Sequence, residues 1–234
     1  MSLSRRRVVQ RAFGGVIKWA RNRNNKAVWG SRAPYADQIL FVNPQDILWQ
    51  FDDVQAQAAH RPDNYMTCGR RTYFYSGTVL DGTWDQYRKP VLSGVQYAAC
   101  HNHFINGQPW EETGIYDEME RRIAEEGVVD KCRTRQDIIA RYAKLDRLYE
   151  TVEKEGRLRT RHELRRAFSK RESGGIYCHI GHDGQFLRYR AGNHRFAIAR
   201  LLKLPEIPVH VGVVHSDAVA RGVVTAHAQS RLRR

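Results

Sequence analysis

Apolar positions recur with the period of an α-helix most clearly in the middle of the chain. They stand at Ile138, Tyr142, Leu145, Tyr149 and Val152. Their steps of 4, 3, 4 and 3 residues place them on one face of a helix. Thr134-Arg135-Gln136-Asp137 approximates a capping box before the run, and Gly156 is a stop signal after it. The pattern predicts one long amphipathic helix between residues 134 and 156.

Weaker patterns predict the other elements. Two more helices are expected, one from Thr113 to Gly127 and one after the capping pattern Thr160-x-x-Glu163. Strand-like segments lie on both sides of this helical middle, at residues 39–47, 72–80, 176–180, 186–190 and 207–214. Residues 195–202 are apolar nearly all round, which is typical of a buried helix. We expect an α/β (α+β) fold, a small mixed sheet with a helical insertion at about residues 111–170.

The charge of the chain is concentrated at its two ends. The net charge is +14 over 234 residues. Residues 1–33 hold nine Lys or Arg and residues 221–234 hold four, with no acid in either segment. Residues 34–220 hold 26 basic and 25 acidic residues. The sequence thus predicts a basic N-terminal arm, one nearly neutral domain and a basic C-terminal tail.

The N-terminal arm has two open interpretations. Residues 4–23 suit a basic amphipathic helix, which Gly14-Gly15 is expected to interrupt. Such a helix can contact nucleic acid or an anionic membrane surface, or it can pack on the body of the protein. No run of 18 apolar residues predicts a transmembrane helix. The four cysteines form no C-x-x-C pair, so we expect reduced thiols and a cytoplasmic protein, peripheral to a membrane if the arm binds lipid.

The strongest candidate site is the corner where a strand runs into Gly192-Asn193-His194-Arg195 and then into the apolar helix. Gly192 lets a ligand approach the backbone closely, and Asn193 is expected to cap the helix. The amides of the first turn point outward at the positive end of the helix dipole. His194 and Arg195 add donors beside them. The corner therefore predicts an anion site, above all for phosphate.

The same corner resembles the signature of the ParB/sulfiredoxin superfamily. The resemblance rests on Gly-x-His-Arg, a small apolar helix, Leu201-x-x-Leu204 and Ile207-Pro208-Val209, and extends over residues 177–214. It implies a ParB/sulfiredoxin-type fold in which this corner holds the phosphates of a nucleotide, ATP or ADP. The chain also resembles uncharacterised proteins, encoded near surface-polysaccharide genes, that share the corner and a Gly-x-Trp-Asp segment, here residues 82–85.

Phosphotransfer at such a corner needs a carboxylate that holds Mg²⁺ or accepts a hydroxyl proton. Asp85 is the preferred candidate for both roles, because the neighbouring Asp81 is explained by the Asp81-Gly82 turn. His194 is the second catalytic candidate. Glu111 and Glu112, beside Trp110, are possible substitutes for Asp85.

Arginines and histidines supply further hypotheses. Arg190, on the strand that enters the corner, is a candidate for a second hydrogen-bond donor to the phosphate. Arg188 lies two positions before it, on the same face of the strand, and one of the two is expected to face solvent. A metal site is a weaker hypothesis, because no established ligand spacing is present. Its histidines would be His101, His103, His179, His182 and His194. Sulfiredoxin chemistry is not expected, since Asn193 stands where the family motif has a cysteine.

The preferred function is a nucleotide- or phosphate-binding protein that acts as a small-molecule phosphotransferase of the kinase type. A ParB-like DNA-associated module or nuclease is the alternative, which the nearly neutral body disfavours and the basic ends favour. A non-catalytic accessory protein at a membrane surface is the third class. The sequence does not indicate the acceptor substrate or the oligomeric state.

Overall fold

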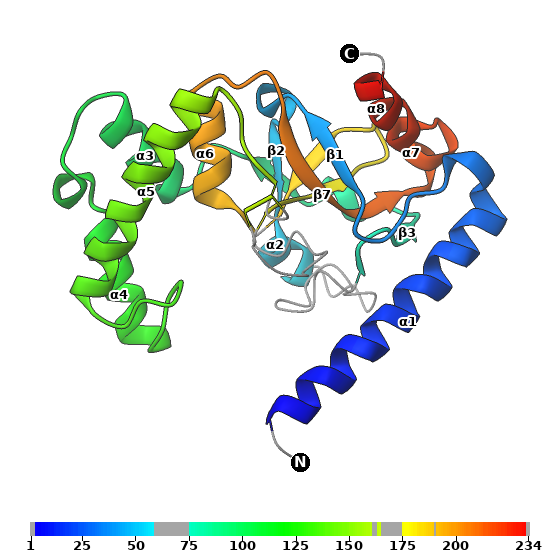
Figure 1. Ribbon diagram of the computed structural model, residues 1–234, viewed down its shortest axis with the longest axis horizontal. Coiled ribbons are helices and arrows are strands. Elements are labelled where there is room, and N and C mark those ends of the chain that lie inside the picture. Colours follow the sequence, from blue (N-terminus) through cyan, green and yellow to red (C-terminus); the bar gives the residue numbers. More distant parts are fainter. Residues whose placement is uncertain (1–2, 59–74, 161–162, 165–174, 190, 233–234) are drawn as a thin grey trace.

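The centre of the molecule is a seven-stranded mixed sheet (Figure 1). The computed structural model describes residues 3–58, 75–160, 163–164, 175–189 and 191–232. The strands are β1 (Ile39–Val42), β2 (Trp49–Phe51), β3 (Val79–Leu80), β4 (Arg88–Pro90), β5 (Ile176–Ile180), β6 (Phe186–Arg188) and β7 (Ile207–His215). Their order is β1-β7-β5-β6-β2-β4, with β3 beside β7. The pairs β5·β7, β2·β6 and β3·β7 are parallel and the others antiparallel. Strands from both sides of the helical middle therefore meet in one sheet, and the expected mixed α/β fold is confirmed.

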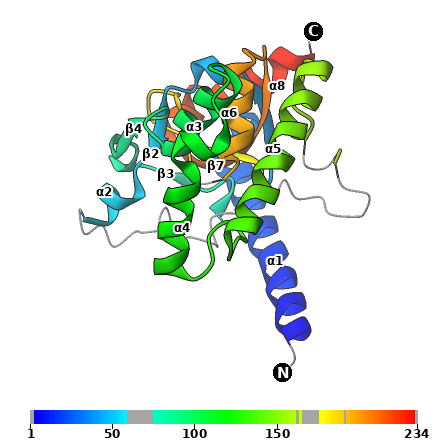
Figure 2. The ribbon, with the colours of Figure 1, turned by 90° about the vertical axis from the view of Figure 1, so that its left-hand side faces the viewer.

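Eight α-helices surround this sheet in the described residues. They are α1 (Leu3–Trp29), α2 (Asp53–Ala58), α3 (Val95–Phe104), α4 (Ile115–Glu126), α5 (Arg135–Glu155), α6 (Asn193–Leu201), α7 (Ser216–Ala220) and α8 (Val223–Leu232). Helices α3, α4 and α5 gather at one end of the molecule, beside α6 (Figures 1 and 2). The helical insertion between β4 and β5 thus begins with α3 at Val95, earlier than the expected residue 111.

Helix α5 agrees closely with its sequence pattern. Thr134 is the N-cap, and its side chain and that of Asp137 form the reciprocal bonds of a capping box. Gly156 ends the helix in the left-handed conformation, with a φ of 61°. Ile138, Tyr142, Leu145 and Val152 are buried. Local signals of this kind define where the helix begins and ends.

The two faces of the sheet carry cores of different character. The larger core holds the apolar side of β1, β5 and β7 together with Phe196, Ala197, Ile198 and Ala199 of α6, so this helix is buried as expected. The smaller core is aromatic, with Phe51, Trp84, Tyr177 and Tyr189 among its members. The rings of Tyr177 and His179 lie over Gly212, where a Cβ would approach within 2.7 Å and 2.5 Å of them. Gly212 therefore makes room for the polar aromatic layer.

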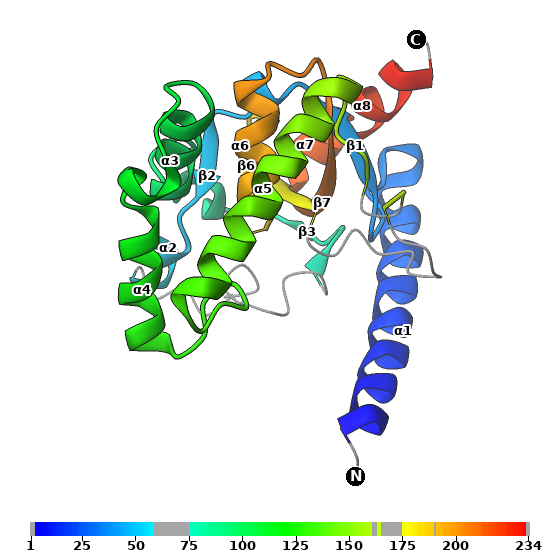
Figure 3. The same cartoon turned by 60° about the vertical axis from the view of Figure 1, so that its left-hand side comes forward.

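Both basic ends are largely part of the folded body. Helix α1 is continuous through Gly14-Gly15, so the expected interruption is wrong. Its second half is bonded to the body, since Lys18 pairs with Asp37 at 2.5 Å and Asn25 donates to two carbonyl oxygens. Helix α8 lies against β1, with Val224 buried. Of the described parts of the two basic ends, the first half of α1 projects beyond the body (Figure 3). No described helix combines the length and the apolar character that crossing a bilayer demands.

Candidate functional site

The corner before α6 has the geometry of an open helix N-terminus. Gly192 is the N-cap with a φ of 75°, and a Cβ at this position would lie 2.9 Å from the Gly175 carbonyl oxygen. Only glycine meets both conditions without strain. No side chain caps α6, so the expectation that Asn193 does so is wrong. Asn193 is instead the first helical residue, and its Oδ1 accepts a hydrogen bond from Arg188.

Arg188 lies behind this corner as a buried cation. The residue is 6% exposed, and its guanidinium donates to two neutral amide oxygens, Oδ1 of Asn193 and Oε1 of Gln50. The ring of Phe196 lies 5.6 Å from its Cζ atom. Among the described residues no carboxylate is within 4.0 Å of it. Burial lowers the pKa of Arg188 to about 10, so it stays charged. Buried charges are normally paired, because desolvation is costly.

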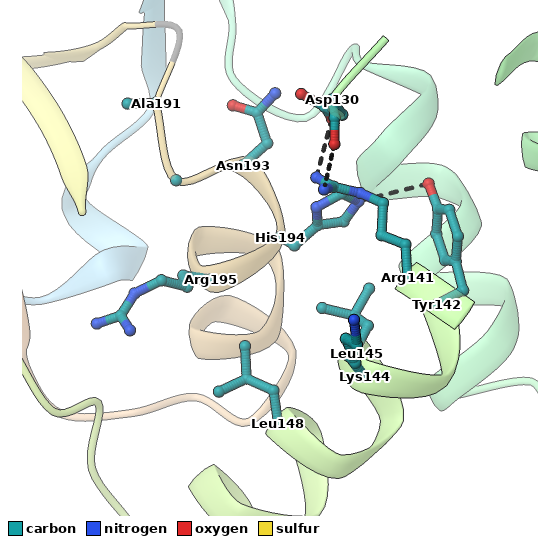
Figure 4. Close-up of a pocket in the computed structure, with 11 residues that line it drawn as sticks. Asp130, Arg141, Tyr142, Lys144, Leu145, Leu148, Ala191, Asn193, His194 and Arg195 are labelled. Atoms are coloured by element: carbon teal, nitrogen blue, oxygen red, sulfur yellow. Dashed lines mark hydrogen bonds and ion pairs between the residues drawn. The ribbon is translucent and has the colours of Figure 1, made fainter. Parts of the chain in front are cut away.

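A cavity of about 510 Å³ opens on the other side of Asn193, between α5 and α6 (Figure 4). The corner lines it with residues 191–195, and α5 and the turn before it supply Asp130, Arg141, Tyr142, Lys144, Leu145 and Leu148. At its rim Arg141 donates to the carboxylate of Asp130 at 2.9 Å and to its carbonyl oxygen at 3.0 Å. Lys144 is exposed and has no ion pair within the described chain. The cavity therefore combines an apolar wall with cations and outward-pointing amides.

His194 lies inside this cavity as a neutral side chain. Its Nε2 is 3.5 Å from the hydroxyl oxygen of Tyr142, and the two rings meet edge to face. Burial lowers the pKa of His194 to about 4, with a further lowering by the charge of Arg141. At neutral pH the imidazole thus carries no charge. One of its nitrogens can donate a hydrogen bond, and the other can accept one.

Arg195 contributes to the wall of the cavity, but its guanidinium is engaged elsewhere. Arg195 is 7% exposed and donates to the carbonyl oxygen of Arg159, which holds α6 to the segment after α5. Figure 4 shows its guanidinium on the side of α6 away from His194. Arg190 lies outside the described residues. Arg188, the other arginine of this strand, faces inward and is buried.

Asp85 lies at the opposite end of β5 from the corner. Gly192 is in contact with the first residue of β5, Ile176, whereas the Asp85 carboxylate lies against Gly181, just after its last residue. Five residues of extended chain separate these points, a distance of about 16 Å. Asp85 therefore cannot contact a phosphate at the α6 N-terminus, and the expectation that it supplies the base or metal ligand there is wrong.

The other two acidic candidates also lie away from the cavity, which contains a different carboxylate. Glu111 and Glu112 are exposed on the short helix η6 (Trp110–Thr113) and do not line the cavity. Asp130 is the carboxylate that does line it, and sequence reasoning missed it. Nothing local marks Asp130, Arg141 or Lys144 as site residues, because they reach the corner only through the packing of α5 on α6 (Figure 3).

The histidines do not gather around His194. His103 contacts the Gln108 carbonyl oxygen and Asp146. His179 is buried in the aromatic layer, where burial lowers its pKa to about 3 and its Nδ1 accepts from the Val213 amide. His182 bonds to Asp85. The imidazole cluster of the weaker hypothesis is therefore not formed. In the described part of the chain, one group has metal-ligand geometry: Asp85, His182 and Asp183.

Cys100, Cys132 and Cys178 are free, buried thiols, as expected for reduced cysteines, and Cys68 lies outside the described residues.

Comparison with protein-family models, curated proteins and solved structures finds no match to this chain.

Proposed function

We propose that this protein binds a phosphate-bearing small molecule, a nucleotide of the ATP or ADP class, at the N-terminus of α6. The observation that carries the proposal is Arg188, one side chain away from an uncapped helix N-terminus. Its guanidinium is buried, and its hydrogen-bond partners among the described residues are neutral. An anion beside Asn193 would offset the desolvation cost of this cation and accept hydrogen bonds from the first-turn amides.

The cavity supplies the rest of a nucleotide site. Its volume of about 510 Å³ lies in the range of pockets for small-molecule ligands. Leu145 and Leu148 offer an apolar wall for a base or sugar. Lys144 and Arg141 line the same cavity, where their charges would attract phosphates that extend from the helix N-terminus. Neutral His194 and the hydroxyl of Tyr142 add hydrogen-bonding groups that do not repel a cationic metal.

Phosphotransfer is the reaction class that we propose for this ligand. Asp130 takes the place that sequence reasoning gave to Asp85, as the carboxylate that lines the cavity. Its pair with Arg141 would have to open before the carboxylate can hold Mg²⁺ or accept a hydroxyl proton, and an incoming phosphate gives Arg141 another anionic partner. His194 is the other group placed to exchange a proton with a bound molecule.

Calorimetric titration of the full chain with ATP, ADP and inorganic phosphate tests the proposal. Replacing Arg188 by Met keeps the length of the side chain and removes its charge. We expect Arg188→Met to weaken phosphate-dependent binding by roughly 10-fold, because it removes the positive charge that lies behind Asn193 and attracts the anion. Lys144→Met, on an exposed position, should weaken it less.

The matched control is Arg147→Met on the exposed surface of α5, outside the cavity. This variant removes one positive charge from α5, the helix that also carries Lys144, and should leave affinity unchanged. Circular dichroism and thermal melting establish that each variant is folded. Equal affinities of the wild-type chain and a folded Arg188→Met variant would overturn the assignment.

A second candidate function is contact with nucleic acid or an anionic membrane surface through α1. The first half of this helix projects from the body, and its sequence holds Arg5, Arg6, Arg7 and Arg11 without an acid (Figure 1). Such a segment binds polyanions by counterion release, largely independently of the fold that carries it.

A further inference from the structure

A second cluster of functional groups lies at the far end of β5, outside the corner and its cavity. It joins Asp85, in the short helix η5 (Trp84–Gln86), to His182 and Asp183 in the turn between β5 and β6. Each of the three offers a ligand atom, and these atoms lie within 4.8 Å of one another. Oδ2 of Asp85 accepts hydrogen bonds from the main-chain amide of His182 at 2.6 Å and from its Nδ1 at 2.5 Å.

Gly181 allows these carboxylates to converge. A Cβ at this position would lie 2.8 Å from Oδ2 of Asp85 and 3.0 Å from Oδ1 of Asp183. Its φ is not in the left-handed region, so the backbone conformation does not require glycine here. What requires it is space, since any side chain would displace one of the two oxygens. Two carboxylates drawn together around one point repel each other unless a cation lies between them.

An independent sign of a missing partner is the second oxygen of Asp85. This residue is 1% exposed, and its Oδ1 is fully buried without a hydrogen-bond donor in the described chain. Buried acceptors are nearly always satisfied, and those that are not call for an explanation such as a water molecule or an ion. A cation bound by both oxygens of the Asp85 carboxylate would supply the partner that Oδ1 lacks.

We propose that Asp85, His182 and Asp183 bind a divalent transition-metal ion such as Zn²⁺ or Mn²⁺. One imidazole and two carboxylates form a mixed nitrogen and oxygen donor set, which suits these ions better than Mg²⁺ or Ca²⁺. The side chains of His182 and Asp183 are 48% and 29% exposed, so the open positions of the ion face solvent. Three protein ligands with an open position are typical of a metal site that also binds water or a substrate.

The residues around this cluster are placed to orient the three ligands, as outer-shell residues do in metal sites. Arg88 donates to Oδ2 of Asp183 at 2.9 Å, and the Gln185 amide donates to its Oδ1 at 3.0 Å, so the orientation of this carboxylate is fixed. The ring of His215 lies 5.8 Å from that of His182. Both of its nitrogens are already used, with the Gly82 carbonyl oxygen and the Asp217 amide, which excludes it as a ligand.

Metal binding to the full chain, measured after treatment with a chelator, tests the proposal. Calorimetric titration with Zn²⁺ and Mn²⁺, without nucleotide, should show one site per chain. The variants Asp85→Asn and His182→Gln should each weaken it at least 10-fold. The matched controls are Asp117→Asn and His101→Gln, which lie outside the cluster and should leave binding unchanged.

The competing explanation is an Asp85–His182 hydrogen bond that never holds an ion. It predicts no saturable binding of Zn²⁺ or Mn²⁺, or binding that folded His182→Gln retains in full, and either result would overturn the proposal. Mg²⁺ binding as tightly as Zn²⁺ would also contradict an imidazole ligand. Because the cluster is about 16 Å from the corner by the length of β5, this outcome is independent of the Arg188 titration.

Discussion

At the scale of single residues, two glycines provide the space that the groups beside the sheet need. Gly192 lets the chain turn into α6 against the backbone of Ile176, and Gly212 leaves room for two polar rings. Both lie where an added Cβ would approach other atoms within 3.0 Å. The sequence shows that these positions are glycines, but only the first lies in a recognisable pattern. Gly212 stands inside the apolar strand β7, where glycine usually weakens a strand.

Gly212→Ala should destabilise the protein by about 1–3 kcal/mol, the usual cost of overpacking a core. The new methyl group would lie 2.5 Å from Nδ1 of His179 and displace the ring that bonds to the Val213 amide. Urea unfolding measures the change. Gly15→Ala is the control, because a Cβ there meets nothing within 4 Å. If the two variants have the same midpoint, the layer over Gly212 is less tightly packed than its distances indicate.

At the scale of elements, α1 divides into two halves with different roles. From Lys18 onward the helix bonds to Asp37, Pro34, Ser76 and Gly77 of the body. Before Lys18 it projects away from the sheet (Figure 3). A deletion that tests the basic arm should therefore end at residue 17, since removal of residues 1–33, the whole expected arm, would also remove packed structure.

Deleting residues 2–17 should abolish most binding to duplex DNA or to anionic vesicles. It removes four arginines, and the slope of log affinity against log salt should fall by up to about 3–4 for DNA. Fluorescence anisotropy at several salt concentrations measures both effects. The thermal midpoint should stay nearly constant, because the contacts of Lys18, Arg21 and Asn25 remain. Undiminished DNA binding by the shortened chain would place the nucleic-acid surface on the body instead.

At the scale of the whole molecule, two histidines, the buried His179 and the half-buried His194, link stability to pH. Burial lowers the pKa of His179 from 6.5 to about 3 and that of His194 to about 4. Below pH 6.5 the unfolded chain therefore binds protons that the native state does not. The free energy of unfolding should thus fall as the pH decreases from 6.5 toward 4.

Between pH 7 and pH 5 each of these histidines should cost roughly 2 kcal/mol of stability. Urea unfolding at the two pH values gives the difference. His179→Asn places an amide oxygen where Nδ1 accepts from the Val213 amide, and it cannot be protonated, so it should remove about half of the loss. A fall of the same size in this variant would show that other groups control the acid sensitivity.

The sequence by itself determined the elements whose signals are local. The spacing of apolar residues and the Thr134–Asp137 capping box define α5, and Gly156 ends it. The apolar composition of residues 195–202 predicts that α6 is buried, and Gly192 marks the corner before it. These features depend on backbone preferences and hydrogen bonds between residues a few positions apart, which the order of amino acids states directly.

Only the tertiary structure decided which functional groups meet. Asp85 and the corner looked like one site in the sequence, but they lie at opposite ends of β5, and Asp85 meets His182 instead. Arg188 is buried because β6 lies between β5 and β2, and Lys144 reaches the cavity because α5 packs on α6. Strand pairing and helix packing join residues far apart in the chain, and the sequence alone leaves several such pairings equally open.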